Sequence, residues 1–318
     1  MDTSPPAPRR RAAPATGPRL CVLGSGSGGN CTVLHPRVDD PAFLLLDAGF
    51  GPRTTTERLR QAGLCLTDCA GLVLTHLDRD HFRTSWVSTV LRTGVPVFCH
   101  QWHAQELALH PRLRVLDDTG MVMPFSAVPF EPLPGVRIQA LMMQHDRQGT
   151  AAFRIECSTV QPLRGTSGVA PARRVAIGYA TDLGHAPPAL IQHFAGVDLL
   201  CIESNYDHHM TKTSARPSFV NRRNLSDSGH LSNDQALDAC VAIDAASPHQ
   251  NPRRIVLLHG STQCNHPTKI RRCFEAQPRI ARRVTLTHQR RRTRWISVPP
   301  LPAMKSGQMR LTPQPTSA

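Results

Sequence analysis

The chain has 318 residues, of which 40% are hydrophobic and 19% charged, as in folded proteins and unlike disordered ones. No apolar run reaches the roughly 20 residues that a membrane-spanning helix needs. The formal net charge is +14, almost all from arginine, whose planar fork of donors suits phosphate oxygens. We therefore predict a polyanionic partner such as nucleic acid, although a GC-rich genome that replaces lysine with arginine would give the same composition.

Both ends of the chain are predicted to be disordered tails. Residues 1–18 are rich in proline, alanine and arginine and lack the apolar segment of a signal peptide, and residues 301–318 form a second tail. The folded domain is expected over residues 19–300. The ten cysteines contain no CxxC pair, which indicates a reducing, cytoplasmic protein. Four of them follow the pattern of small buried hydrophobes: Cys21, Cys99, Cys157 and Cys201.

Short apolar strands and helices alternate through the first half of the domain. The glycine-rich segment 24–30 superficially resembles a dinucleotide-binding loop, but a strand follows it where that fingerprint needs a helix. We therefore interpret it as a tight turn. The predicted strands of this half are 19–24, 31–35, 42–49, 71–76 and 95–100, and its predicted helices are 54–63, 80–94 and 103–110.

The second half continues the same alternation, which predicts an α/β fold. Ser232 is a good capping residue for the helix that follows it. Two polar segments are interpreted as a surface loop, 158–174, and an irregular stretch, 206–229. The predicted strands are 136–146, 150–157, 175–184, 197–205, 253–260 and a final pair at 284–288 and 292–298, and the predicted helices are 187–196, 232–246 and one more before the final pair.

Metal-capable side chains recur where apolar strands end. Ligand-binding residues of α/β folds gather at this carboxyl edge of the sheet. A single histidine after a strand is usually structural, but five such strand ends together indicate a site. The five residues are Asp47, His76, His145, Asp182 and His259.

The central motif is Thr-His-Leu-Asp-Arg-Asp-His at residues 75–81. Its four ligand-type side chains cannot all serve one metal, but a loop can divide them between two. The motif resembles the HxHxDH signature of the metallo-β-lactamase superfamily, and the resemblance extends over about residues 19–300. It implies an αββα sandwich, in which two mixed β-sheets are flanked by helices, with a two-metal active site.

The resemblance also implies which residues bind each metal ion. His76, Asp78 and His145 would hold one divalent ion, and Asp80, His81 and His259 the other. Asp182 would bridge the two ions, and Asp47 would orient the motif loop without binding metal. The middle histidine of the signature is Asp78 here. Since a carboxylate is a harder ligand than imidazole, Mn²⁺ or Fe²⁺ is favoured, with Zn²⁺ still possible.

Four further segments resemble the WalJ/YycJ-like branch of this superfamily, which implies a 5′-exonuclease acting on DNA. They are SGSGGNCTVL, ESNYDHHM, RRNLSDSGHLSNDQA and LLHGSTQCNHP. Glu203 and His230 within them resemble a pair that protonates the leaving oxygen in ribonuclease Z, and with Asp80 they are the predicted catalytic residues. The alternatives are a strand-end ion pair for Glu203 and a capping role for His230.

Three other functions stay open at this point. They are a ribonuclease Z-like RNA nuclease, a hydrolase of small esters or cyclic phosphodiesters, and a non-catalytic nucleic-acid-binding module whose metal site has decayed through Asp78. His185 is a further residue that could approach the metals, whereas His208 and His209 are interpreted as surface or substrate-loop residues. The run 289–295 is either a phosphate-binding track or a solvated edge hairpin.

Overall fold

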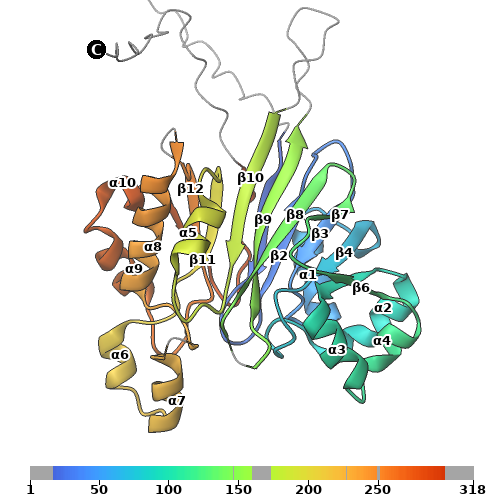
Figure 1. Ribbon diagram of the computed structural model, residues 1–318, viewed down its shortest axis with the longest axis horizontal. Coiled ribbons are helices and arrows are strands. Elements are labelled where there is room, and N and C mark those ends of the chain that lie inside the picture. The colour runs from blue at the N-terminus through green and yellow to red at the C-terminus, as the bar shows by residue number, and fades with distance from the viewer. Residues whose placement is uncertain (1–16, 146, 160–172, 227, 249–250, 298–318) are drawn as a thin grey trace, which may run out of the picture.

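The computed structural model describes residues 17–297, apart from 146, 160–172, 227 and 249–250. Two seven-stranded mixed β-sheets pack against each other, and helices cover the outer face of each sheet (Figure 1). The predicted α/β fold, an αββα sandwich, is therefore confirmed. The predicted tail 301–318 and nearly all of 1–18 and of the loop 158–174 lie outside the described residues.

The first sheet has the strand order β14-β1-β2-β3-β4-β5-β6. Its antiparallel part is formed by β14, β1, β2 and β3, and parallel pairing begins between β3 and β4. The strands are β1 (Arg19–Gly24), β2 (Cys31–His35), β3 (Phe43–Leu46), β4 (Cys69–Val73), β5 (Val97–His100), β6 (Val122–Phe125) and β14 (Ile296–Ser297).

The second sheet has the order β13-β12-β11-β10-β9-β8-β7. Here β10 to β13 are parallel to one another, and β7 to β10 pair antiparallel. The strands are β7 (Phe130–Leu133), β8 (Val136–Met143), β9 (Thr150–Thr159), β10 (Arg173–Ala180), β11 (Leu199–Glu203), β12 (Arg254–Leu258) and β13 (Val284–Leu286).

Successive side chains of a strand point to opposite faces of its sheet and are buried in different hydrophobic clusters. In β1, Leu20 and Val22 face the second sheet, whereas Cys21 and Leu23 face the outer helices. This period of two explains why the strands are apolar throughout, since both of their faces are buried. Cys21, Cys99, Cys157 and Cys201 are all buried, as predicted.

Helices α1 to α4 pack on the first sheet, and α5, α8, α9 and α10 on the second. Ser232 forms the predicted cap, because its Oγ accepts a hydrogen bond from the backbone N of Gln235 at 3.1 Å. None of the described helices combines the length and the hydrophobicity needed to cross a bilayer. The helices are α1 (Pro52–Gln61), α2 (Val87–Thr93), α3 (Gln101–Leu109), α4 (Arg114–Asp118), α5 (Pro188–Phe194), α6 (His208–Lys212), α7 (Ser218–Asn224), α8 (Asn233–Ala246), α9 (Pro267–Phe274) and α10 (Pro278–Ala281).

The helix predicted over 80–94 begins later than expected. Only Val87–Thr93 is α-helical, after a 3₁₀ turn at Thr84–Trp86. Residues before it are held in a loop, because the carbonyls of Asp80 and His81 accept hydrogen bonds from backbone N–H groups of the 30–48 region. The loop's non-local contacts therefore override its helical pattern.

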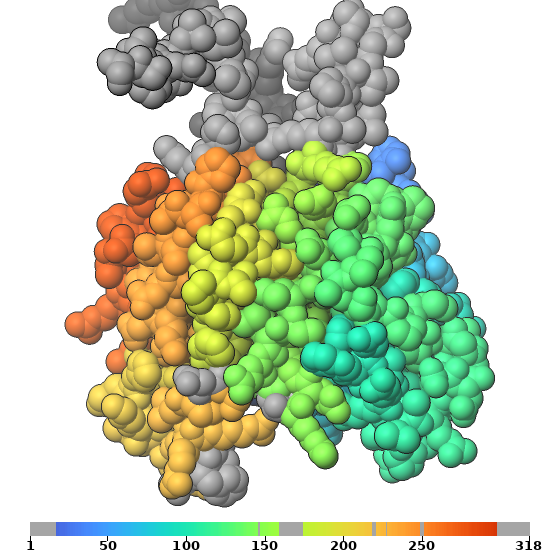
Figure 2. All heavy atoms as spheres, viewed as in Figure 1, coloured from blue at the N-terminus to red at the C-terminus, as the bar shows by residue number. Residues whose placement is uncertain are grey.

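Two other predictions were wrong. The stretch 206–229 is not irregular throughout, because it contains α6 and α7. The final two strands do not pair with each other: β13 joins β12 in the second sheet and β14 joins β1 in the first. Both partners lie far away in sequence, so no local pattern indicates them. Together, α6 and α7 project at the same edge of the molecule as α3, on either side of the β8–β9 turn (Figures 1 and 2).

Candidate metal centre

Three strands end in a polar residue with an unusual backbone conformation. Asp47 follows β3, Asp182 follows β10 and His259 follows β12, with φ values of 62°, 57° and 56°. Within the described parts of the chain, no other residue except glycine has positive φ. A conformation of this kind costs about 1–3 kcal/mol and persists where the surroundings enforce it, most often at functional sites.

Two histidines of the 75–81 motif are oriented by hydrogen bonds through Nδ1. His81 Nδ1 lies 2.9 Å from Asp47 Oδ2. His76 Nδ1 lies 3.0 Å from Thr75 Oγ1, whose own proton goes to Asp47 Oδ1 at 2.9 Å. Because Nδ1 acts as the donor in both rings, Nε2 of each carries the free lone pair that a metal needs.

Two histidines from the second sheet are oriented in the same way. His145 Nδ1 lies 3.1 Å from the carbonyl oxygen of Gly229, and His259 Nδ1 lies 3.0 Å from Glu203 Oε1. In both rings Nε2 is again left for a ligand. The orienting partners are a backbone carbonyl and a buried carboxylate, which are the usual partners of metal-binding imidazoles.

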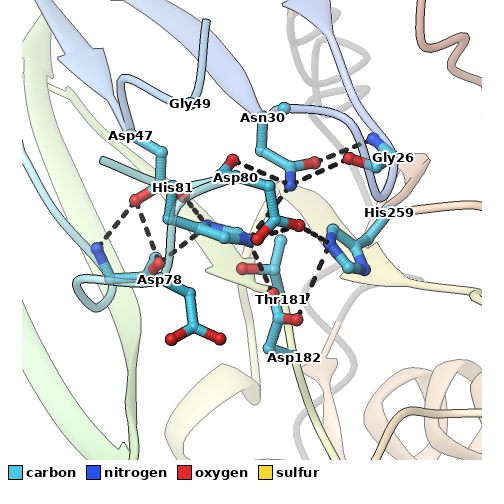
Figure 3. A network of polar contacts seen from close by, with 12 residues as sticks. Gly26, Asn30, Asp47, Gly49, Asp78, Asp80, His81, Thr181, Asp182 and His259 are labelled. Carbon is cyan, nitrogen blue, oxygen red and sulfur yellow. Dashed lines mark hydrogen bonds and ion pairs between the residues drawn. The ribbon is translucent and has the colours of Figure 1, made fainter. Parts of the chain in front are cut away.

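The free Nε2 atoms converge on Asp182. Its Oδ2 lies 2.9 Å from His81 Nε2, and its Oδ1 lies 3.6 Å from His259 Nε2 and 3.8 Å from His145 Nε2. Asp80 Oδ2 lies 3.1 Å from His259 Nε2. Figure 3 shows Asp80, His81, Asp182 and His259 pointing toward one another from three separate segments, namely the 75–81 loop and the ends of β10 and β12.

This donor set fits two metal ions. His76 Nε2 is buried and makes no hydrogen bond to any described residue, which is costly unless another ligand satisfies it. The potential ligand atoms of the described residues form three overlapping groups, and the atoms of each group lie within 4.8 Å of one another. One of them joins Asp182 and His259 to Glu203 and His230, and the other two correspond to the predicted metal positions. Of these two, one is His76, His145 and Asp182, and the other is Asp80, His81 and His259.

Asp78 is the predicted ligand that belongs to none of these groups. Its carboxylate lies to one side of the cluster in Figure 3, 3.8 Å from His76 Nε2, and its side chain is 45% exposed. His185 is likewise outside the groups of converging ligand atoms that the described residues form. His208 opens α6, and its ring packs against Tyr206. The metal-binding role of Asp78 stays a prediction.

Charges within the cluster set the protonation of its members. Burial lowers the pKa of His76 well below its usual value, and the nearby His81 adds to this, so the ring is neutral. Burial alone would raise the pKa of Asp182, but His259 and His81 hold that pKa well below its usual value. Burial alone would lower the pKa of His259, but Asp182, Asp80 and Glu203 raise it to about 10. A metal bound at Nε2 would displace this proton.

The glycine-rich segment 24–30 contributes to the site, which the sequence did not indicate. Asn30 Nδ2 lies 3.0 Å from His81 Nε2 and 3.3 Å from the carbonyl oxygen of Asp80 (Figure 3). Ser25 Oγ accepts a hydrogen bond from the backbone N of His259 at 2.7 Å. The interpretation as a tight turn was therefore incomplete, because this turn also holds the metal-site loops in place.

Glu203 is completely buried beside the cluster and interacts with four N–H groups. Its Oε2 accepts hydrogen bonds from the backbone N of Leu183 at 2.7 Å and of Leu231 at 3.2 Å. Its Oε1 lies 2.8 Å from His230 Nδ1 and 3.0 Å from His259 Nδ1. Burial would raise the pKa of Glu203, but His230 and His259 overcome this and lower it. Both oxygens of the Glu203 carboxylate are therefore engaged, and one of them contacts the rings of His230 and His259.

A family comparison agrees with this geometry. The profile of the family described as "Beta-lactamase superfamily domain" matches residues 43–259, more than half of the chain. The chain belongs to the metallo-β-lactamase superfamily. The match spans the Asp47, 75–81, His145, Asp182 and His259 positions, so the family and the converging side chains coincide in one region.

Two exodeoxyribonucleases are related to this chain in sequence. Exodeoxyribonuclease YycJ of Bacillus anthracis is 26% identical over 69% of this chain and 75% of its own length. Exodeoxyribonuclease WalJ of Streptococcus pneumoniae is 22% identical over 70% of this chain and 76% of its own length. The resemblance to the YycJ and WalJ proteins is therefore confirmed at the level of distant homology.

Solved superfamily structures share the fold at lower identity. Zn²⁺-bound PqqB of Methylobacterium extorquens superposes with a TM-score of 0.60 at 16% identity, covering 86% of this chain and 99% of that protein. The short form of human tRNase Z gives a TM-score of 0.54 at 16% identity, covering 88% of this chain and 99% of that protein. These matches establish the architecture of this chain.

Replacing Asp47 with asparagine tests whether this carboxylate orients the motif loop. The amide cannot accept from both Thr75 and His81 as the carboxylate does. We expect metal affinity to fall by about 10- to 100-fold, measured by titration of the metal-free protein. The exposed Asp39, replaced in the same way, should keep the original affinity. Equal affinities in the two variants would show that Asp47 has no orienting role.

Proposed function

We propose that this chain is a two-metal phosphodiesterase that removes nucleotides from the 5′ end of DNA. The observation that carries the proposal is the contact between Glu203 and His230 beside the metal centre. His230 Nδ1 lies 2.8 Å from Glu203 Oε1 and 3.4 Å from Asp182 Oδ1. A phosphodiesterase must protonate a poor leaving group, the 3′-oxygen of a nucleotide, and this pair is placed to do so.

The roles of the chain's own groups follow from their contacts. The two predicted ligand sets would hold two divalent ions. Such ions would activate water and neutralise charge on the phosphoryl oxygens. Glu203 contacts His230 through Nδ1 and so fixes the orientation of its ring. The His230 side chain is 19% exposed, so a leaving oxygen that approaches from solvent can reach the ring. Glu203 thus orients the proton donor, and His230 supplies the proton.

Several further features support a nucleic acid substrate. The net charge of +14 favours binding of a polyanion. The relatives named above are exodeoxyribonucleases, which favours DNA over RNA. Phosphate contacts carry no base information, so little sequence specificity is expected.

The proposal is tested with DNA and RNA of one sequence, labelled at either the 5′ or the 3′ end, in the presence of Mn²⁺. Early release of a 5′-labelled mononucleotide from DNA would support it. Faster cleavage of RNA would support a ribonuclease instead. Cleavage of neither strand, with two metals bound per chain, would refute the nuclease and favour a small-molecule ester or phosphodiester.

Replacing His230 with alanine should slow DNA cleavage by about 10²- to 10⁴-fold, because the leaving alkoxide would lose its proton donor. The loss should be much smaller for bis(p-nitrophenyl) phosphate, whose leaving group needs no proton. Metal content should stay unchanged, since His230 lies outside the two predicted ligand sets. An equal loss on both substrates would contradict the role of a proton donor. His110, which follows α3 and belongs to none of the groups of converging ligand atoms, provides a histidine-to-alanine control.

Asp78 is proposed to select the metal. With the carboxylate present, we expect metal analysis of the purified protein to find mainly Mn or Fe, since these ions prefer harder ligands than Zn²⁺ does. Replacing Asp78 with histidine should raise the zinc fraction. An unchanged metal composition would mean that Asp78 is not a ligand.

A further inference from the structure

A pocket of about 630 Å³ lies between α1 and the segment that precedes β14. Six arginines and one acidic residue line it, and we call it the arginine pocket. The arginines come from two separate parts of the chain, which the fold brings together on the side of β1. They are Arg53, Arg58, Arg290, Arg291, Arg292 and Arg294, and the acidic residue is Glu57.

Two of these arginines are used by the fold. The Arg58 guanidinium lies over the Phe50 ring at 4.2 Å and donates to the carbonyl oxygen of Leu23 at 2.9 Å. The Arg292 guanidinium donates to the carbonyl oxygens of Thr293 and of Gln61, the last residue of α1. These contacts build the walls of the pocket.

The side chains of the other four arginines make no such contacts with the described part of the protein. The side chains of Arg53, Arg290, Arg291 and Arg294 are exposed, and none makes a hydrogen bond or ion pair within the described residues. Glu57 does not neutralise them, since its carboxylate is paired with Arg60 and Gln61. Four like charges are therefore gathered without a counter-charge, which is unfavourable unless an anion binds there.

The segment that lines the arginine pocket is linked to the metal centre through the glycine-rich turn. Gln289 is next to Arg290; its Oε1 accepts from the backbone N of Gly28 at 2.7 Å and its Nε2 donates to Gly29 O at 3.0 Å. The next residue, Asn30, contacts His81 Nε2. The segment that carries four of the arginines thus begins at the glycine-rich turn that holds the metal-site loops.

We propose that the arginine pocket binds successive phosphates of the nucleic acid strand whose end lies at the metal centre; this rests on the proposed nuclease function. One guanidinium group can donate hydrogen bonds to two oxygens of the same phosphate. Several unpaired arginines next to one another therefore match successive phosphates of a strand better than they match one small anion. Such contacts recognise only the sugar-phosphate backbone. The pocket would therefore extend the binding site along the strand and raise affinity without adding sequence preference.

The test removes three of the unpaired charges together: Arg290→Gln, Arg291→Gln and Arg294→Gln. The control carries Arg271→Gln, Arg272→Gln and Arg282→Gln, which removes the same charge from exposed positions on and near α9 and α10. The dissociation constant for a single-stranded DNA of about 20 nucleotides is measured by fluorescence anisotropy, in EDTA and at several salt concentrations.

We expect the pocket variant to bind the strand on the order of tenfold more weakly at low salt, with the slope of log K against log[salt] reduced by about 2. The control should match the wild type. Equal affinities and slopes for the pocket variant and the control would overturn the inference. It would also be overturned if dAMP bound to the wild type as tightly as the strand, since the pocket would then be a small-anion site.

Failure of the proposed function would be seen separately, in the wild-type protein. If the pocket variant bound DNA more weakly than the control but the wild type never cleaved DNA with Mn²⁺, the phosphate-binding role of the pocket would be supported and the nuclease function refuted. Cleavage that proceeds normally while the pocket variant binds like the control would refute the strand site alone.

Discussion

Replacing Asp182 with alanine is expected to slow hydrolysis by more than about 10³-fold, equivalent to about 4 kcal/mol of transition-state stabilisation. The two carboxylate oxygens of Asp182 face both groups of ligand atoms: Oδ1 lies 3.8 Å from His145 Nε2 and Oδ2 lies 2.9 Å from His81 Nε2. Without it, each group loses a ligand and the histidines lose the charge that they surround. Metal content should fall from about two ions per chain to one or none, as measured by elemental analysis.

The exposed Asp39, replaced by alanine, is the matched control and should leave rate and metal content as they were. An Asp182→Asn variant separates loss of charge from loss of shape. Circular dichroism of each variant shows whether the fold survives. Two ions bound and a rate within about tenfold of the original would refute the bridging role.

Replacing Gly49 with alanine is expected to damage the metal centre through the backbone. A Cβ at this position would lie 1.8 Å from the carbonyl oxygen of Asp80 and 2.6 Å from the backbone N of Asn30. Neither group is the end of a flexible side chain, so the Asp80 loop would have to move. We expect a loss of unfolding free energy of about 3 kcal/mol, together with loss of metal-dependent activity.

Gly51 provides a control in the same segment. Its added Cβ would meet nothing closer than Ser85 Oγ at 3.6 Å, an ordinary contact, and its φ of −64° suits alanine. Thermal unfolding and activity of the Gly51→Ala protein should stay near the original. If Gly49→Ala behaved in the same way, the close approach of the 49 and 80 backbones would be irrelevant to the site.

The candidate metal ligands could be predicted from the sequence because they have two recognisable features, their position after apolar strands and the 75–81 motif. His76, Asp182 and His259 each follow an apolar strand, and parallel strands place their carboxyl ends at one edge of a sheet. The 75–81 motif added the family resemblance. The alternation of strands and helices likewise predicted the layered fold, and most strands were placed within a few residues.

Features that depend on distant partners could not be predicted in this way. Asn30 lies 51 residues from His81, and its turn has the composition of many turns that bind nothing. The start of α2 at Val87 is set by hydrogen bonds from Ala48 and Asn30 to the preceding loop. The separation of β13 and β14 depends on which sheet each strand joins. In each case a tertiary contact outweighed a local preference.

The arrangement of ligands on two sheets has a mechanical consequence. Asp80 and His259 meet across the sandwich although 179 positions separate them along the chain. Ions bound there would act as cross-links between the halves of the folded protein and would stabilise the folded state by their binding free energy, which is lost when the chain unfolds. Chelation should therefore loosen the two halves from each other at this edge before the cores open, and hydrogen exchange at the ends of β3, β4, β10 and β12 would record it first.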